Sequence, residues 1–290
     1  MFSEYLKTRF KDDFNDIWDS FFVPKKVGFF ITDLSVKNEI LAEFSGAYEL
    51  FSDFYILPSE QKSALSHSDF FQNGQLYIQN PSSFLVPLNL NLSQNDEICD
   101  MCASPGGKSI ALNFLAIKQN LSISQAVIES DKTRFFTLKK NLAKHGLQSI
   151  RAYNKDGRSI AKSCANRFDK IILDAPCSSY SHFGADFKEK SRAELKAIAK
   201  LQKQLLNAAL CALKDGGEMI YSTCTFFEAE NEEVIKNALN SRFEIEILPL
   251  NLPANAKIIK NSFGALILPD EIYSAFFITK IKKIKSKFFP

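Results

Sequence analysis

The fold of this 290-residue chain is decided by the stretch Glu97-Ile98-Cys99-Asp100-Met101-Cys102-Ala103-Ser104-Pro105-Gly106-Gly107-Lys108. Residues 97–101 have the apolar character of a short strand, and the apolar spacing over residues 108–118 predicts a helix. Between them, two adjacent glycines allow the backbone to turn sharply. A strand that passes through a glycine turn into a helix is the repeating unit of a sheet with crossover helices.

Strand and helix patterns alternate downstream of this unit. Further strands are predicted over residues 125–130, 149–153, 169–173, 218–221, 243–248 and 273–280. Further helices are predicted over residues 132–145, 191–213 and 229–240, the first of them closed by Gly146. The alternation predicts an α/β fold with a doubly wound, mostly parallel sheet.

Residues upstream of about position 80 have a different pattern. Helical spacing of large apolar residues covers 2–22, a second helix is predicted over 35–43, and short strands over 26–32, 53–57 and 75–79. We expect a small α+β domain over residues 1–70 and a larger domain over residues 71–290. The aromatic residues of the small domain are interpreted as core.

Charge is divided unequally between these two parts. Residues 1–70 carry 7 Lys and Arg against 12 Asp and Glu, whereas residues 71–290 carry 29 against 21. Positive charge on the larger part suits a polyanionic partner. Residues 280–287 contain five lysines and no acid, so this segment either contacts phosphates or is a solvated end that protects a final strand.

The composition favours a cytoplasmic protein with reduced thiols. No apolar run is long enough to span a membrane, and the first residues lack the basic start and apolar stretch of a signal peptide. Six cysteines in a chain of this length do not form a disulfide framework. Cys99 and Cys102 should point to opposite faces of a strand, and the three histidines are isolated, so we expect no metal site.

Three features predict a cofactor at the ends of the first strands. The amide groups that follow Gly106 and Gly107 can face a carboxylate. Glu129 ends the second strand, where an acid commonly accepts hydrogen bonds from ribose hydroxyls, and Asp156 follows the third strand, in place to accept from an adenine amino group. The Gly-x-Gly-x-x-Gly of dinucleotide enzymes is absent here, and a tight turn without a ligand stays an alternative for residues 105–108.

Two cysteines follow two further strands. They lie in the motifs Asp174-Ala175-Pro176-Cys177-Ser178 and Ser222-Thr223-Cys224-Thr225. Side chains just past the ends of parallel strands project into the crevice where ligands bind. Because a thiolate is a strong nucleophile near neutral pH, two thiols in one crevice predict nucleophilic chemistry, although a single such cysteine is usually a small buried hydrophobe.

In this order, the three motifs resemble those of the RNA cytosine-C5 methyltransferases of the RsmB/Nop2/Sun family. The resemblance covers roughly residues 71–283 and includes Gln202 and Glu230-Asn231. It implies a Rossmann-like class I methyltransferase fold, S-adenosylmethionine as cofactor, and RNA as substrate, with ribosomal RNA ahead of transfer RNA. The loop after Cys177 departs from the family, because it lacks the usual basic segment followed by Pro-Asp.

The resemblance also implies a role for each site residue. Cys224 would attack the base, Cys177 would assist release of the product, and Asp174 would hydrogen-bond the cytosine near the methyl donor. Glu129 would hold the ribose of the cofactor, with Asp131 as a competitor, and Asp156 the adenine. The amino-acid part of the cofactor would lie around Cys102, Ala103, Ser104, Pro105, Gly106, Gly107 and Lys108.

Two alternatives remain open from the sequence. A DNA cytosine-C5 methyltransferase would use the cysteine of the Pro-Cys motif as nucleophile, but its Glu-Asn-Val segment is not found in the matching place. A non-catalytic RNA-binding assembly factor would not need both cysteines, Asp174 and the glycine turn intact. Residues 1–70 are a candidate RNA-positioning extension, and we expect a monomer.

Overall fold

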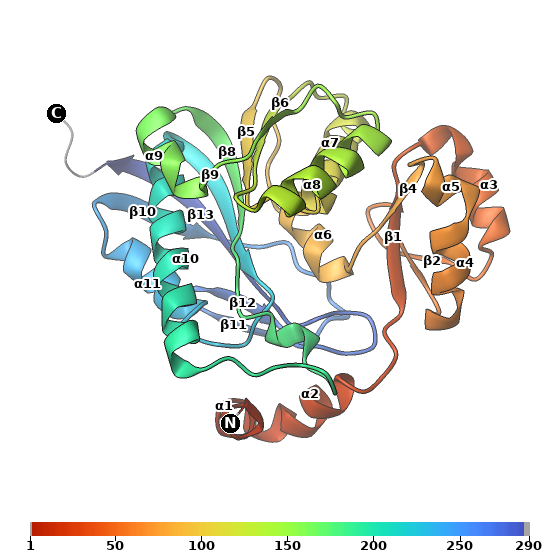
Figure 1. Ribbon diagram of the computed structural model, residues 1–290, viewed down its shortest axis with the longest axis horizontal. Helices are drawn as coiled ribbons and strands as arrows, with labels where there is room; N and C mark the ends of the chain where they lie inside the picture. The colour runs from red at the N-terminus through yellow and green to blue at the C-terminus, as the bar shows by residue number, and fades with distance from the viewer. Residues whose placement is uncertain (1, 287–290) are drawn as a thin grey trace.

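The computed structural model describes residues 2–286 and is organised around two sheets (Figure 1). The larger sheet has the strand order β11-β12-β13-β9-β8-β5-β6-β7, with β10 paired to β13. Its parallel part consists of β5 (Glu97–Met101), β6 (Ser124–Ile128), β7 (Arg151–Tyr153), β8 (Phe168–Asp174) and β9 (Leu213–Thr223). Its antiparallel part consists of β10 (Phe243–Leu248), β11 (Ile258–Asn261), β12 (Gly264–Ile267) and β13 (Phe276–Ser286).

Helices cover both faces of the larger sheet (Figure 1). One face packs against α6 (Pro81–Leu88), α7 (Gly107–Lys118) and α8 (Lys132–Lys144). The other packs against α9 (Ile160–Ser163), which follows η4 (Gly157–Ser159), and against α10 (Arg192–Ala212) and α11 (Glu232–Leu239). Apolar side chains from the sheet enter both layers, because the strands are buried on both faces. The predicted Rossmann-like, doubly wound fold is therefore confirmed.

The strand register brings the predicted motifs to one edge of this sheet. Met101 at the end of β5 lies beside Leu173 of β8 on one side and Ile128 of β6 on the other. Asp174 at the end of β8 lies beside Ser222 of β9. Because all these strands are parallel, the residues that follow them converge on the same crevice.

The smaller sheet lies at one end of the molecule (Figure 1). Its strands are all antiparallel in the order β2-β3-β1-β4, with β1 at Val27–Ile31, β2 at Tyr48–Phe51, β3 at Phe54–Leu57 and β4 at Leu76–Ile78. It carries the helices η2 (Leu34–Val36), α3 (Lys37–Glu43), η3 (Ser59–Gln61), α4 (Lys62–His67) and α5 (Asp69–Gln72). The predicted aromatic core is present, since Phe29, Phe30 and Phe54 are fully buried.

The single helix predicted over residues 2–22 is wrong. The segment forms α1 (Phe2–Phe10), η1 (Lys11–Asp13) and α2 (Phe14–Ser20), and the backbone of Lys11 has a φ of +38° at the first break. These helices lie against the larger sheet's loops (Figure 1), where the ring of Phe2 is 4.6 Å from Tyr180 and 5.7 Å from Phe226. The boundary near residue 70 stays a prediction, but residues 2–20 contact the larger unit.

The lysines near the C-terminus do not form the exposed segment expected from the sequence. β13 extends to Ser286, and Lys283 inside it is fully buried, with Nζ donating to the carbonyl oxygen of Leu213 (2.8 Å) and to Oδ1 of Asn166 (2.7 Å). Lys280 is also buried, 3.3 Å from Glu218. These two cations are therefore structural, while Lys287 lies outside the described residues. Within residues 2–286, no helix combines the length and apolar character needed to cross a membrane.

Candidate active site

A cavity of about 180 Å³ opens where β5 ends and α7 begins. Seven of the residues predicted to bind the cofactor line it, namely Cys102, Ala103, Ser104, Pro105, Gly107, Lys108 and Asp174. The wall is completed by residues that were not predicted to bind the cofactor, namely Tyr77, Ile78, Gln79, Asn80, Ser83 and Asp100. The small sheet thus contributes through β4, whose last residue is Ile78.

The two glycines are needed for the shape of this cavity. Gly106 has a φ of +109°, which is left-handed backbone that favours glycine. A Cβ at Gly107 would lie 2.7 Å from the ring of Tyr77. The first amide groups of α7 therefore face the cavity without an intervening side chain, as an anion-binding helix N-terminus requires.

Two buried carboxylates near the cavity have an oxygen without a hydrogen bond. Asp100 accepts from Ser109 Oγ (2.6 Å) at Oδ2, and Glu129 accepts from the amide of Asp131 (3.0 Å) at Oε1, but Oδ1 and Oε2 have no such partner. Burial raises the pKa of Asp100 to about 7. Buried oxygens normally accept a hydrogen bond. These two carboxylates therefore fit a ligand that carries an ammonium group and hydroxyls, which can donate to them. The sequence analysis did not predict Asp100 as a cofactor residue, although an acid inside an otherwise apolar strand could have indicated it.

Asp156 caps the short helix η4 after β7. Its two carboxylate oxygens accept from Arg158, at 3.0 Å from Nε to Oδ1 and 2.5 Å from Nη2 to Oδ2. The same arginine holds the pKa of Asp156 below its usual value. An adenine amino group would share this carboxylate with Arg158, so the adenine contact stays a prediction.

Asp174 is held from two elements. Lys108 Nζ, at the start of α7, donates to Oδ2 of Asp174 (2.6 Å) and to Ser83 Oγ (2.7 Å). Ser222 Oγ, at the end of β9, donates to Oδ1 (2.7 Å). The carboxylate is half-exposed to the cavity, so it is fixed in orientation while a ligand can still reach it.

The two motif cysteines meet at this edge of the sheet. The Sγ atoms of Cys177 and Cys224 are 3.1 Å apart, and both cysteines are free. The hydrogen bond from Cys177 is the main reason that the pKa of Cys224 is lowered well below its usual value, whereas this bond and burial raise the pKa of Cys177. These opposite directions favour the proton on Cys177 and thiolate character at Cys224.

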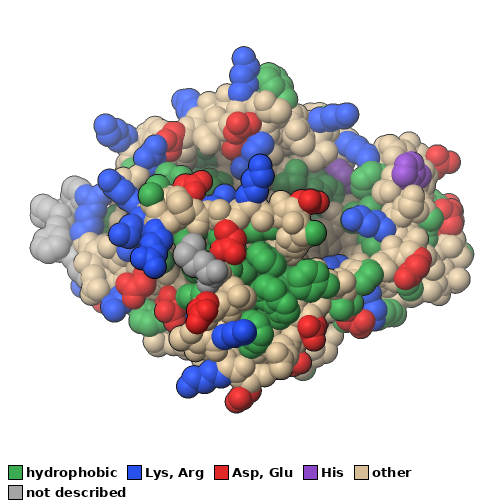
Figure 2. Space-filling model, turned by 60° about the horizontal axis from the view of Figure 1, so that its bottom comes forward, with side chains coloured by type: hydrophobic (Ala, Val, Ile, Leu, Met, Phe, Trp, Pro, Cys, Tyr) green, Lys and Arg blue, Asp and Glu red, His purple; other side chains and the backbone are tan. Residues whose placement is uncertain are grey.

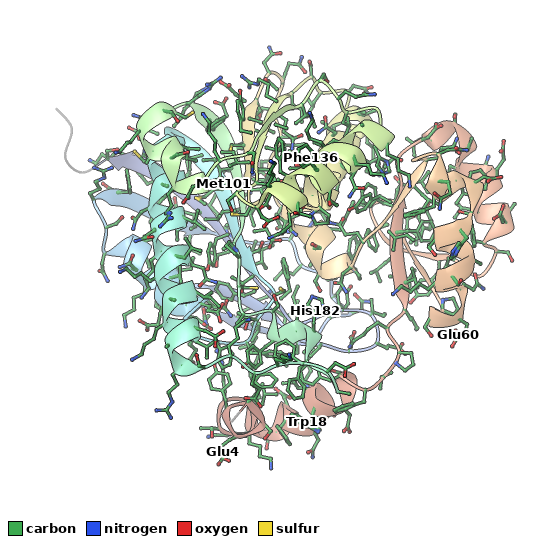
Figure 3. The ribbon with its side chains drawn as sticks, in the orientation of Figure 1. Glu4, Trp18, Glu60, Met101, Phe136 and His182 are labelled. Carbon is green, nitrogen blue, oxygen red and sulfur yellow. The ribbon has the colours of Figure 1, made fainter. Side chains whose placement is uncertain are left out.

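His182, which the sequence left isolated, lies beside this pair. It ends η5 (Tyr180–His182) and lies above Trp18 in the view of Figure 3. A hydrogen bond with Cys224 raises the pKa of His182 and further lowers that of Cys224. The sequence analysis expected no metal site at the histidines, and it did not predict this contact of His182 with Cys224. The sequence feature that could have indicated His182 is its position five residues after Cys177, in the loop that departs from the family.

A buried carboxylate joins the two cysteine motifs. Glu230 Oε2 accepts from the amide of Ser178 (2.9 Å) and from Gln202 Nε2 (3.0 Å), which also donates to the carbonyl oxygen of Pro176 (3.0 Å). Ser178 and Thr225 are linked by their hydroxyls at 2.8 Å. The residues that follow Cys177 and Cys224 are therefore linked to each other. Gln202 and Glu230, which take part in this network, are two of the residues that carry the resemblance to the family.

Cys99 and Cys102 belong to no metal centre of the described residues. Cys102 leaves the strand with a left-handed backbone (φ +59°), so both cysteines pack against one apolar cluster and do not point to opposite faces. Across residues 2–286, no group of three or more His, Cys, Asp or Glu side chains is arranged to hold a metal ion.

The proton on Cys177 leads to a prediction about thiol reactivity. Iodoacetamide should alkylate Cys224 before Cys177, and the rate at Cys224 should change little between pH 7 and pH 8.5. An ordinary thiol gains roughly tenfold in thiolate over this range, because its pKa is about 8.5. In Cys177→Ala the main cause of the lowered pKa is lost, so the ordinary pH dependence should reappear. Peptide mapping by mass spectrometry measures both rates, and an ordinary profile for Cys224 in the unmodified protein would contradict this proton placement.

Comparison with known proteins agrees with this geometry. A family model described as 16S rRNA methyltransferase RsmB/F matches residues 87–282. The mitochondrial tRNA (cytosine(34)-C(5))-methyltransferase of Mus musculus is 30% identical over 234 residues, or 74% of this chain and 67% of that protein. Ribosomal RNA small subunit methyltransferase F of Vibrio vulnificus is 30% identical over 243 residues, or 80% of this chain and 51% of that protein.

A solved structure is similar over almost the whole chain. It is described as a methyltransferase homolog protein from Pyrococcus horikoshii, has 26% identity and a TM-score of 0.81, and covers 97% of this chain and 94% of its own. The chain spans about half to two thirds of the length of the curated relatives described above. The match to the family model covers most of the sequence, including all three motifs. The chain belongs to the RsmB/F family of S-adenosylmethionine-dependent RNA methyltransferases.

Proposed function

We propose that this chain is an RNA cytosine-C5 methyltransferase that acts through a covalent adduct on Cys224. The observation that carries the proposal is the pair of thiols whose Sγ atoms are 3.1 Å apart. The raised pKa of Cys177, the lowered pKa of Cys224 and the nearby charge of Asp174 support it. One nucleophile and one proton-carrying group at the same crevice are what addition to a pyrimidine ring and later elimination require. The family match supports RNA over DNA as the polymer.

The chemistry follows from the poor reactivity of carbon 5 in an aromatic ring. The Cys224 thiolate adds to C6 of the cytosine, and the electron pair of the broken double bond makes C5 nucleophilic. S-adenosylmethionine, when bound, supplies the methyl group as a sulfonium electrophile. The C5 proton is then lost to a base, the C5–C6 double bond re-forms and the Cys224 thiolate leaves. Cys177 assists this release, and Asp174, fixed by Lys108 and Ser222, accepts a hydrogen bond from the cytosine.

The cofactor is assigned to the cavity at the start of α7. The amides of Gly107 and Lys108 face its carboxylate, the free oxygen of Asp100 suits its ammonium group, and Glu129 accepts from its ribose. Lys108 Nζ is committed to Asp174 and Ser83, so this lysine contributes to the cofactor site through its backbone.

Glu129→Ala should weaken binding of S-adenosylmethionine by about 5- to 150-fold. The change removes hydrogen bonds worth about 1–3 kcal/mol from a buried carboxylate. Calorimetric titration measures the affinity. Asp131→Ser is the matched variant, because serine keeps the cap of α8 while deleting the competing acid. If Asp131→Ser weakens binding and Glu129→Ala does not, the ribose contact belongs to Asp131.

Ribosomal RNA is placed ahead of transfer RNA as substrate, because the matching family model is described by 16S rRNA. Relatives of similar identity include enzymes named for each kind of RNA. The purified chain should transfer labelled methyl groups to RNA and not to DNA. Bisulfite sequencing of total RNA from cells with and without the gene should then show one unconverted cytosine in ribosomal RNA that is lost without the gene. Transfer to DNA alone would contradict the proposal.

A further inference from the structure

The loop that carries Cys224 has no regular structure of its own. Cys224 follows the last residue of β9, and residues 224–231 form neither helix nor strand. A loop without ladder hydrogen bonds depends on surrounding side chains for a fixed conformation. The accuracy of that conformation matters, because a displacement of about 1 Å in a reacting group can slow a reaction about 100-fold.

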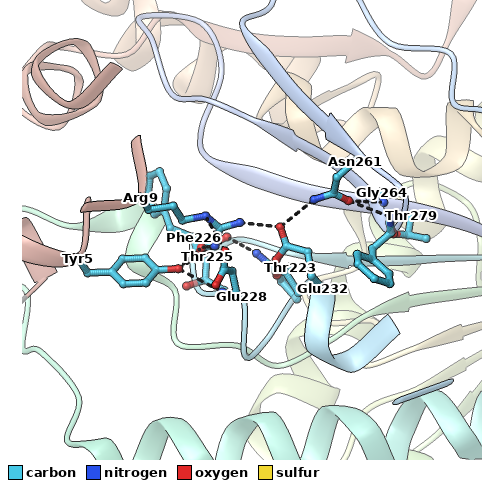
Figure 4. A network of polar contacts seen from close by, with 12 residues as sticks. Tyr5, Arg9, Thr223, Thr225, Phe226, Glu228, Glu232, Asn261, Gly264 and Thr279 are labelled. Atoms are coloured by element: carbon cyan, nitrogen blue, oxygen red, sulfur yellow. Dashed lines mark hydrogen bonds and ion pairs between the residues drawn. The ribbon is translucent and has the colours of Figure 1, made fainter. Parts of the chain in front are cut away.

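The N-terminal helix α1 supplies hydrogen bonds to this loop (Figure 4). Arg9 Nη1 donates to the carbonyl oxygen of Phe226 (2.5 Å), two residues after Cys224. The hydroxyl of Tyr5 donates to the same oxygen (3.1 Å) and accepts from the amide of Glu228 (3.2 Å). Two side chains one turn apart on α1 therefore satisfy both a carbonyl and an amide of the loop.

The guanidinium of Arg9 also reaches the end of the loop. Its Nη2 donates to Oε1 of Glu232 (2.5 Å), the first residue of α11, and Asn261 Nδ2 from the β11–β12 turn donates to the same oxygen (3.2 Å). The side chains of Arg9 and Glu232 are only 14% and 11% exposed. A charge-assisted pair shielded from water in this way holds its partners in a defined geometry.

The rest of the loop is held from within its own domain. Asn231 accepts from Thr223 Oγ1 (2.5 Å) and donates to the carbonyl oxygen of Thr225 (3.0 Å). These bonds fix the two residues next to Cys224 but do not reach Phe226. Backbone hydrogen bonds hold the second half of the loop, among them those from the amide of Glu230 to the carbonyl oxygen of Phe227 (3.0 Å) and from the amide of Glu233 to that of Glu228 (2.9 Å). What α1 holds is the carbonyl of Phe226 and the amide of Glu228.

We propose that Arg9 is a positioning residue for the nucleophilic thiol of Cys224. It holds the Phe226 carbonyl and the Glu232 carboxylate, and so sets the path of the loop between β9 and α11. The inference rests on the proposed function. It gives the N-terminal segment a role in placing the nucleophile, whereas the sequence predicted a role in RNA contact.

The test compares Arg9→Met with Lys7→Met in the full chain. Both changes remove one positive charge from α1, but Lys7 is exposed and its ammonium lies over the ring of Phe14. Arg9→Met should lower kcat for methyl transfer to RNA by about 10- to 100-fold, with the KM for RNA changed by less than about twofold. Lys7→Met should keep both parameters. Arg9→Lys should recover part of kcat, because one ammonium can replace one of the two contacts.

Tyr5→Phe keeps the proposal testable if Arg9→Met does not fold. It keeps the ring, which packs on Phe227, and deletes only the hydroxyl, so kcat should fall by a few fold with an unchanged KM. A rise in the KM for RNA with an unchanged kcat, in Arg9→Met or in Tyr5→Phe, would overturn the proposal and make α1 an RNA-binding element. Unchanged kcat and KM in both variants would overturn it as well.

A second measurement separates this proposal from the proposed function. The rate of iodoacetamide alkylation at Cys224, without RNA or cofactor, should fall several-fold in Arg9→Met and stay unchanged in Lys7→Met. This rate reports the placement of the thiol and needs no methyl transfer. If the unmodified chain methylates no RNA while the alkylation rates differ as expected, the proposed function fails and the positioning role stands. Equal alkylation rates in the two variants would overturn the positioning role.

Discussion

Replacing Cys224 by alanine should reduce methyl transfer by more than about 10⁴-fold, because the covalent route has no other nucleophile. In this variant Cys177 loses the hydrogen bond with Cys224 that is the main cause of its raised pKa, but burial still raises that pKa and disfavours a second thiolate. Cys224→Ala should also form no RNA adduct that survives denaturing electrophoresis. Transfer of labelled methyl groups to RNA, with gel analysis of the same reactions, measures both effects.

Cys211→Ala is the matched control for this variant. It removes another half-buried thiol, one that lies outside both motifs and whose Sγ donates to the carbonyl oxygen of Ala161 on α9. It should keep full activity, and both variants should stay folded, because each loses one small side chain. Binding of S-adenosylmethionine should be unchanged in Cys224→Ala. If this variant retains activity, the covalent mechanism is wrong for this chain.

Replacing Cys177 by alanine should have the opposite effect on the RNA adduct, which should accumulate. Cys224 can still attack the base, but breakdown of the methylated adduct loses its assistance, so a protein–RNA complex should accumulate. The complex should appear only when S-adenosylmethionine is present, because Cys177 is needed after methylation. Loss of the Cys177 hydrogen bond also raises the pKa of Cys224, so the adduct should form faster at pH 8.5 than at pH 7.

The double variant Cys177→Ala/Cys224→Ala identifies the residue that carries the adduct. It should show no complex under any condition, whereas Cys177→Ala alone shows one. A complex that appears instead with Cys224→Ala would reverse the two roles and give the arrangement of the DNA enzymes. A complex that forms in Cys177→Ala without the cofactor would place the action of Cys177 before methylation.

Much of this site was predictable from local sequence. A short apolar strand, two glycines and an amphipathic helix encode the turn at Gly106, because each part depends on neighbours within a few residues. The spacing of strands and helices then determines a parallel sheet, and parallel strands must end at one edge. From this alone, Cys177, Cys224 and Asp174 were expected in one crevice, and the structure places their side chains together.

Local sequence also predicted elements whose position it could not specify. The apolar spacing of residues 2–22 correctly indicated helix, but not the break at Lys11 or the surface that the helices cover. Periodicity shows which face of a helix is buried and carries no information about its partner. The contacts of Arg9 with Phe226 and Glu232 join residues more than 200 positions apart, so only the folded chain shows them.

The sequence by itself determined the order of the motifs and the fold class, and it predicted Cys177 and Cys224 as the two reactive thiols. Only the tertiary structure decided the ionisation of those thiols, the approach of His182 and the burial of Lys283. The physical reason is that residue type and spacing describe covalent neighbours. A pKa, a buried oxygen without a hydrogen bond such as Oδ1 of Asp100, or a buried cation depends on which distant groups and how much water surround it in space.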